Sequence, residues 1–105
     1  MWVPNTDVIL TKSLLVIVVE LAGMRKEELE LTAEEGRIRI QGRRGHPRLA
    51  ESADSGTHLV KEINFGSFET MIETPHDFDP TLAKATYQIG FLLIEVPKRV
   101  QVGRF

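Results

Sequence analysis

The stretch that decides the fold is Ala85-Thr86-Tyr87-Gln88-Ile89-Gly90-Phe91-Leu92-Leu93-Ile94-Glu95-Val96-Pro97-Lys98. It predicts a strand, a tight turn and a second strand, because Gly90 readily adopts the positive φ of a short hairpin turn and Ile89 does not. Nearly every side chain from residue 91 to residue 96 is apolar, so we expect the second strand to be covered on both faces. Pro97 has no N–H to donate to a ladder, so the strand should end there or run along an edge. A strand of this kind belongs in the middle of a sandwich or barrel.

Length and composition indicate a single domain. The chain has 105 residues, and its 13 Lys and Arg against 15 Asp and Glu leave a formal charge of -2, which argues against a general nucleic-acid binder. The absence of cysteine excludes disulfides, thiol catalysis and cysteine-ligated zinc, and it fits a cytoplasmic location. The longest apolar run, residues 14–19, is too short to span a bilayer, and no secretory signal is visible. We therefore expect a cytoplasmic protein that binds neither nucleic acid nor a membrane.

Short segments with the composition of strands recur along the chain, separated by turn residues. Before the two strands described above, they cover residues 7–10, 14–21, 29–34, 37–41, 58–63 and 69–74. Their β-branched content or their alternation of apolar and polar residues favours strands over helices. Helical turns are expected around residues 24–28 and after Asp79, where Asp79 can cap and Pro80 suits the first helical position. The pattern predicts an all-β fold, an immunoglobulin-like antiparallel β-sandwich of about eight short strands.

A polar connection interrupts this pattern from Gly42 to about Thr57. A connection of this length inside a compact domain is usually either functional or disordered. The strands of the sandwich also leave sheet edges, and exposed edges invite other chains to add strands. From its residues alone, the sequence therefore predicts a protein-binding or self-associating module.

No group of polar residues in the sequence predicts catalysis. His76, Asp77 and Asp79 could be metal ligands, but an acidic turn after a strand-ending proline is more often structural. The chain contains no G-x-S-x-G nucleophile motif and no phosphate-binding loop. We expect no catalytic residue, no cofactor and no metal site, and hence no enzyme.

Arginines gather around the end of the strand at residues 37–41, and glutamates surround them. The arginines are Arg37, Arg39, Arg43 and Arg44, and the glutamates are Glu27, Glu28, Glu30, Glu34 and Glu35. Because charges of both signs are mixed there, we expect a solvated surface or an ion-pair network rather than a nucleic-acid site.

Several short motifs, in a fixed order along the whole chain, resemble those of one family. They are Trp2-x-Pro4-x-x-Asp7, Glu20-Leu21-Ala22-Gly23, Arg37-Ile38-Arg39-Ile40-Gln41-Gly42, Glu62 with Phe65-Gly66-Ser67-Phe68, and finally Ala85, Gly90, Leu92 and Val96-Pro97-Lys98. Each is weak alone, but together the chain resembles the α-crystallin domain of small heat-shock proteins.

The resemblance implies an ATP-independent chaperone of the holdase type, which binds partly unfolded proteins and prevents their aggregation. Its partners would be those clients and a second copy of itself, in a homodimer or a small oligomer. The α-crystallin domain would cover residues 1–98, a short C-terminal tail would cover residues 99–105, and the N-terminal arm of relatives would be absent.

The resemblance also implies three interaction sites. In a strand-exchanged dimer, the segment His58, Leu59, Val60 and Lys61 would pair with the partner subunit. A groove would be walled by Leu29, Leu31 and Ala33 on one side and by Ala85 and Tyr87 on the other. Val100 and Val102 match a tail motif that docks in this groove in relatives, although the same residues could simply continue a strand or fray.

Two other functions fit the same fold. One is an adaptor with the related CS-type sandwich, a co-chaperone module that lacks the exchange segment and normally stays monomeric. The other is a structural module of larger assemblies. Mass in solution separates the first from the holdase, and an assay of client aggregation separates the second.

Overall fold

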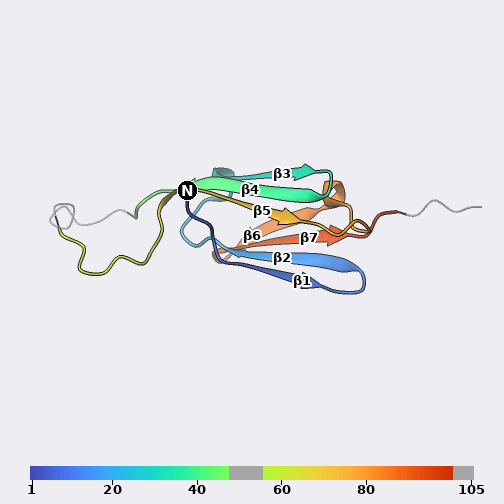
Figure 1. Cartoon of the computed structure of the whole chain (residues 1–105). Helices are drawn as coiled ribbons and strands as arrows, with labels where there is room; N and C mark the ends of the chain where they lie inside the picture. Colours follow the sequence, from blue (N-terminus) through green and yellow to red (C-terminus); the bar gives the residue numbers. More distant parts are fainter. Residues whose placement is uncertain (48–55, 101–105) are drawn as a thin grey trace, which may run out of the picture.

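The computed structural model describes residues 1–47 and 56–100, and these residues form a sandwich of two antiparallel sheets (Figure 1). One sheet has the order β1 (Thr6–Leu10), β2 (Leu14–Glu20), β7 (Phe91–Pro97) and β6 (Lys84–Gln88). The other has the order β3 (Leu29–Glu34), β4 (Arg37–Arg44) and β5 (Gly66–Glu73). Two single-turn 3-10 helices, η1 (Lys26–Glu28) and η3 (Pro80–Leu82), precede β3 and β6. The predicted all-β antiparallel sandwich is confirmed.

The core lies between the two sheets and is filled by alternate residues of the central strands and by one residue of the edge strand β5. These are Leu15, Ile17 and Val19 of β2, Ile38 and Ile40 of β4, Phe68 of β5, and Leu92, Ile94 and Val96 of β7, all of them buried. Strand β7 pairs with β2 on one side and with β6 on the other. The expectation that both of its faces are covered was wrong, because only one face points into the core, while Phe91 on the other face is exposed and Leu93 and Glu95 are half-buried. Pro97 ends it, as predicted.

The chain is tightly packed around Gly42 in β4. Gly42 pairs with Phe68 of β5, and a Cβ atom on Gly42 would lie 2.8 Å from the Phe68 ring and 2.7 Å from the carbonyl oxygen of Glu28. Only a glycine leaves room for the ring and for the end of η1 at this position.

The turn between β6 and β7 differs from the sequence-based expectation. Gln88 pairs with Phe91, so the loop has only two residues, and both have positive φ, 54° at Ile89 and 83° at Gly90. Two-residue hairpins favour this geometry because its twist matches that of the strands. The carbonyl of Gly90 also accepts a hydrogen bond from Leu21 N at 2.7 Å. The expectation that Ile89 avoids positive φ was wrong because the register and this contact determine the turn.

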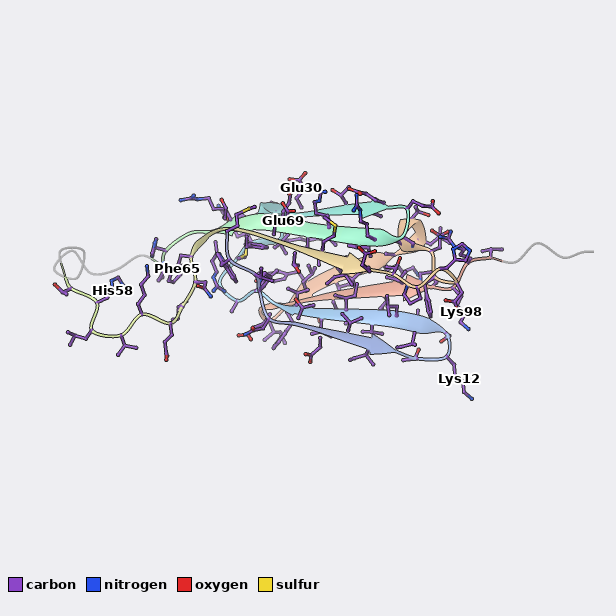
Figure 2. The ribbon with its side chains drawn as sticks, viewed as in Figure 1. Lys12, Glu30, His58, Phe65, Glu69 and Lys98 are labelled. Atoms are coloured by element: carbon purple, nitrogen blue, oxygen red, sulfur yellow. The ribbon has the colours of Figure 1, made fainter. Side chains whose placement is uncertain are left out.

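The outer face of the three-stranded sheet is charged. Arg37 donates to Glu34 at 2.7 Å, and Arg39 lies 3.8 Å from Glu34 and 3.9 Å from Glu69. The hydrogen bond from Arg37 holds the pKa of Glu34 below its ordinary value. Figure 2 shows Glu30 and Glu69 projecting from this sheet. The predicted ion-pair network is therefore present, although Arg44 contributes to a different cluster.

The chain leaves the sandwich after β4 and returns at β5. We call residues 56–65 the arm, and Figure 1 shows it running away from both sheets. The strand expected at residues 58–63 is not formed, because no described strand of the same chain lies alongside to supply a ladder. Within residues 1–47 and 56–100, no helix is long and apolar enough to cross a membrane.

Candidate functional site

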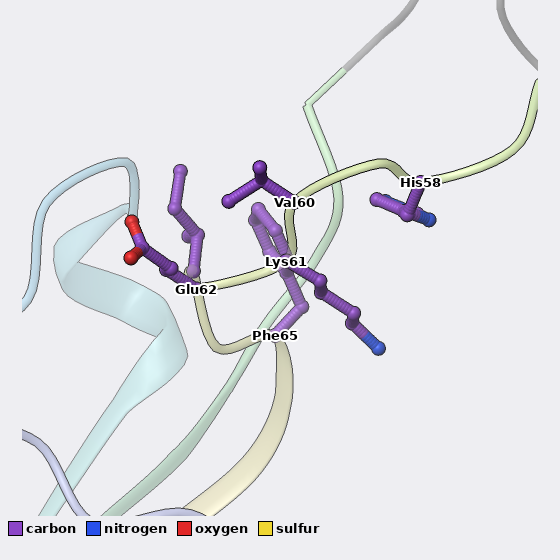
Figure 3. A pocket seen from close by; sticks show the side chains of 6 residues that line it. His58, Val60, Lys61, Glu62 and Phe65 are labelled. Atoms are coloured by element: carbon purple, nitrogen blue, oxygen red, sulfur yellow. The ribbon is translucent and has the colours of Figure 1, made fainter.

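The arm exposes apolar side chains that the sandwich does not cover. Leu59 is 94% exposed and Val60 is 74% exposed, and Ile63 is also exposed. A bend in the arm forms an open hollow of about 210 Å3 (Figure 3), with His58 and Glu62 at opposite ends of it. Exposed apolar residues gathered on one segment are typical of a surface that binds another protein.

A second exposed apolar segment is β1, which forms an edge of the four-stranded sheet. Val8, Ile9 and Leu10 are all exposed, and β1 pairs only with β2 among the described strands. Its outer N–H and C=O groups are therefore available to a further strand. Sequence reasoning did not single out this edge, although three consecutive apolar residues in a short strand were a usable signal.

A small cleft of about 100 Å3 lies between the edge strands β3 and β6, where the family resemblance implies a groove. It brings together Leu29, Leu31, Ala85 and Tyr87, along with Lys26, Thr86 and Leu92. Ala33 does not line the cleft, because it lies near the opposite end of β3, where it pairs with Ile38.

Tyr87 is held in the wall of this cleft by two hydrogen bonds. Its hydroxyl donates to the Leu21 carbonyl at 2.5 Å and accepts from Met24 N–H at 3.3 Å. Both partners belong to the connection between β2 and η1, so this connection fixes the position of the ring.

This arrangement of two sheets, a long excursion and a cleft between edge strands can be compared with known proteins. Residues 7–104 match the Hsp20/alpha crystallin family. The chain belongs to this family.

Individual relatives agree with this assignment. The chain is 32% identical to Heat shock protein 16 of Schizosaccharomyces pombe over 95 residues, which are 90% of the chain and 66% of that protein. It is 30% identical to Small heat shock protein C4 of Rickettsia felis, over 93% of the chain and 58% of that protein. It therefore spans less than two thirds of the length of these two relatives.

Solved structures agree as well. The crystal structure of a small heat-shock protein from Xylella fastidiosa superposes with a TM-score of 0.76 at 27% identity, and the match covers 98% of each chain. The resemblance inferred from the sequence motifs is thus confirmed for the family and for the fold.

The tail of this Hsp20 family member begins with a well-anchored residue. Arg99 N–H donates to the Asp77 carbonyl at 2.8 Å, and Arg99 Nε donates to the His76 carbonyl at 2.6 Å. Val100 follows and is exposed. Val102 lies outside the described residues, so docking of the tail motif stays a prediction.

The acidic turn before η3 has a structural role. The Asp79 carboxylate accepts hydrogen bonds from Thr81 N at 3.0 Å and Thr81 Oγ1 at 2.6 Å, which cap η3. The bonds from Thr81 hold the pKa of Asp79 below its ordinary value. In the part of the chain that the structure describes, no three His, Asp or Glu side chains are grouped closely enough to hold a metal ion.

Proposed function

We propose that this protein is an ATP-independent chaperone of the holdase type, located in the cytoplasm. It would bind partly unfolded proteins and prevent their aggregation, and it would work as a homodimer or a small oligomer. Membership of the Hsp20/alpha crystallin family supports this proposal. The observation that carries it is the apolar arm, whose Leu59 and Val60 are exposed and would be covered by a partner chain.

The physical basis of holding is coverage of apolar surface. A destabilised client exposes apolar side chains and strand edges, which drive its aggregation. Covering such surface contributes about 25 cal/mol per Å2 of apolar area removed from water. No bond is made or broken in this process, so no catalytic residue or cofactor is required. The proposal also includes no nucleic-acid or membrane partner.

The dimer would form by strand exchange between arms. Residues His58 to Lys61 of each arm would pair along β1 of the other subunit, where Val8, Ile9 and Leu10 are exposed. The alternation of a strand would then place Leu59 and Val60 on opposite faces of the extended sheet. The other edges are less open, because β3 and β6 flank the cleft and Trp2 bonds to β5.

The first experiment measures mass and holding activity together. Size-exclusion chromatography with light scattering should give at least twice the chain mass of 11.9 kDa. A thermolabile model enzyme heated with an equal concentration of subunits should scatter less light than the enzyme alone, with or without ATP. A monomer without protective effect would contradict the proposal and favour the adaptor, and an oligomer without protective effect would favour a structural module.

A second experiment tests the arm directly. The double variant Leu59→Asp with Val60→Asp should dissociate into monomers, because an exchanged strand would carry one new carboxylate on each face of the extended sheet, and the carboxylate on the core-facing side would lose its hydration. The variant Lys12→Asp produces the same change in net charge at the β1–β2 turn (Figure 2) and should remain dimeric. A double variant that stays as dimeric as the wild type would exclude strand exchange through the arm.

The cleft between β3 and β6 would receive the tail motif of a neighbouring subunit, with Val100 and Val102 as the docking side chains. Replacing both valines with Gly should then reduce any species larger than a dimer, while Leu31→Lys in the cleft should have the same effect. An unchanged distribution of oligomers by light scattering in both variants would exclude this docking.

A further inference from the structure

Arg44, the last residue of β4, connects three separate segments at the base of the arm. Its Nε and Nη2 atoms donate to the Asn64 carbonyl at 2.9 Å and 2.6 Å, and its Nη1 donates to the Ala22 carbonyl at 3.2 Å. One side chain therefore links β4 to the connection after β2 and to the arm just before β5.

The guanidinium of Arg44 also lies against aromatic rings. Its central carbon is 4.5 Å from the centroid of the Trp2 ring and 5.6 Å from that of the Phe65 ring. Phe65 in turn stacks on His46 at 4.3 Å. Trp2 is itself held by a hydrogen bond from Nε1 to the Gly66 carbonyl at 3.0 Å. Cation–π contacts of this kind add to the hydrogen bonds and fix the plane of the guanidinium.

The chemistry of this cluster requires arginine rather than any cation. Arg44 has no carboxylate within ion-pair distance among the described residues, so its donors serve neutral carbonyls. A planar fork with several fixed N–H groups can bond two carbonyls and stack on a ring at the same time. A lysine ammonium carries the same charge but offers no such fork.

The two hydrogen bonds from Arg44 to the Asn64 carbonyl are the only hydrogen bonds that join residues 56–65 to the rest of the described chain. Among the described side chains, Arg44 is therefore the one that hydrogen-bonds the arm to the sandwich.

We propose that Arg44 is the positioning residue of the exchange arm. By fixing Asn64 it sets where the arm starts and limits the directions in which His58 to Lys61 can extend. This inference rests on the proposed strand exchange. A segment already oriented for pairing loses less conformational freedom when it binds, and preorganisation of this kind raises affinity.

The test compares Arg44→Lys with Arg43→Lys, a matched change at the exposed neighbouring residue. Analytical ultracentrifugation gives the dissociation constant of the dimer, and the fluorescence of Trp2, the one tryptophan of the chain, reports contact with residue 44. Hydrogen exchange at residues 62–65 reports order at the base of the arm. Arg44→Lys should shift the Trp2 emission, speed exchange at the base and raise the dissociation constant about tenfold, since hydrogen bonds from a charged donor are strong. Arg43→Lys should change none of these.

Several results would overturn the inference. An unchanged dissociation constant in a dimeric protein would show that Arg44 does not position the arm, and unchanged Trp2 emission would show that the contact does not exist. Faster exchange throughout β2 and β7 would indicate a general loss of stability instead. A wild type that is monomeric at every concentration would contradict the strand exchange itself, which is a separate result from an unaffected dimer.

Phe65→Leu provides a second variant if Arg44→Lys folds poorly. It removes the ring above the guanidinium and leaves the three hydrogen bonds in place, so a smaller rise in the dissociation constant is expected. A rise equal to or larger than that of Arg44→Lys, or no rise at all, would count against the assigned role.

Discussion

At the scale of single residues, the β6–β7 turn places a β-branched side chain where the backbone disfavours it. Ile89 has a φ of 54° and is 94% exposed, so it gains little from packing. Asparagine tolerates this conformation better. We therefore expect Ile89→Asn to raise the free energy of unfolding by about 1 kcal/mol, measured by urea denaturation at a fixed protein concentration. Ile89→Val keeps the branch at Cβ and should give no gain. Equal effects of the two variants would refute this explanation.

A second residue-scale prediction concerns the close approach at Gly42. A methyl group there would collide with the Phe68 ring and with the backbone of Glu28, so Gly42→Ala should lower the free energy of unfolding by about 1–3 kcal/mol. Gly45→Ala is the control, because a Cβ atom at Gly45 meets nothing within 4 Å. A shift in the urea midpoint of the same size in both variants would show that packing at Gly42 is not the cause.

At the scale of elements, the first residues of the chain hold β5 at the edge of its sheet. Trp2 N–H donates to the Ser67 carbonyl at 3.3 Å, and the Trp2 carbonyl accepts from Glu69 N–H at 3.4 Å. The Trp2 ring also packs on Phe68, with the ring centroids 5.1 Å apart. This contact joins the N-terminal segment, which leads into β1, to the opposite sheet.

Removing this ring should therefore loosen β5. We expect Trp2→Ala to lower the free energy of unfolding by about 2 kcal/mol, less than for a fully buried tryptophan because the ring is only half-buried. Val3→Ala changes an exposed neighbour and should have almost no effect. The midpoint of urea unfolding measures both, and a comparable loss in the two variants would contradict the role given to the ring.

At the scale of the whole molecule, the proposed exchange of arms would couple folding to association. The melting temperature should then rise with protein concentration, by about 3–5 °C for each tenfold increase. The double variant Leu59→Asp with Val60→Asp should melt at a temperature that does not depend on concentration. Calorimetry at several concentrations tests both statements, and a constant melting temperature in the wild type would argue against an obligate dimer.

The molecule as a whole has two kinds of surface, one charged and one apolar. The outer face of the three-stranded sheet carries the ion pairs of Glu34, Arg37 and Arg39, which keep it hydrated. The arm and the β1 edge carry exposed aliphatic side chains instead. Consecutive exposed aliphatic residues are thus found in the arm and along the β1 edge, away from these ion pairs.

Local sequence patterns determined most of the strands and where they end. The bounds of β3 agree with the alternation of residues 29–34, and the end of β7 agrees with the missing N–H of Pro97. Asp79 caps η3 as expected. These features depend on side-chain period and backbone sterics within a few residues, and such information is present in the sequence.

Only the tertiary structure decided which distant segments meet. The cleft brings Leu31 and Tyr87 together from strands far apart in the chain, and no local pattern in the sequence predicts this contact. The two-residue register of the hairpin and the hydrogen bond from Leu21 N to the Gly90 carbonyl fix the turn that contains Ile89. The cluster around Arg44 brings Trp2, Ala22 and Asn64 together. The strand-like composition of the arm formed no strand, because a ladder needs a neighbouring strand and local sequence cannot supply one. The physical reason is the same in each case, since contacts between segments far apart in the chain depend on how the sheets pack.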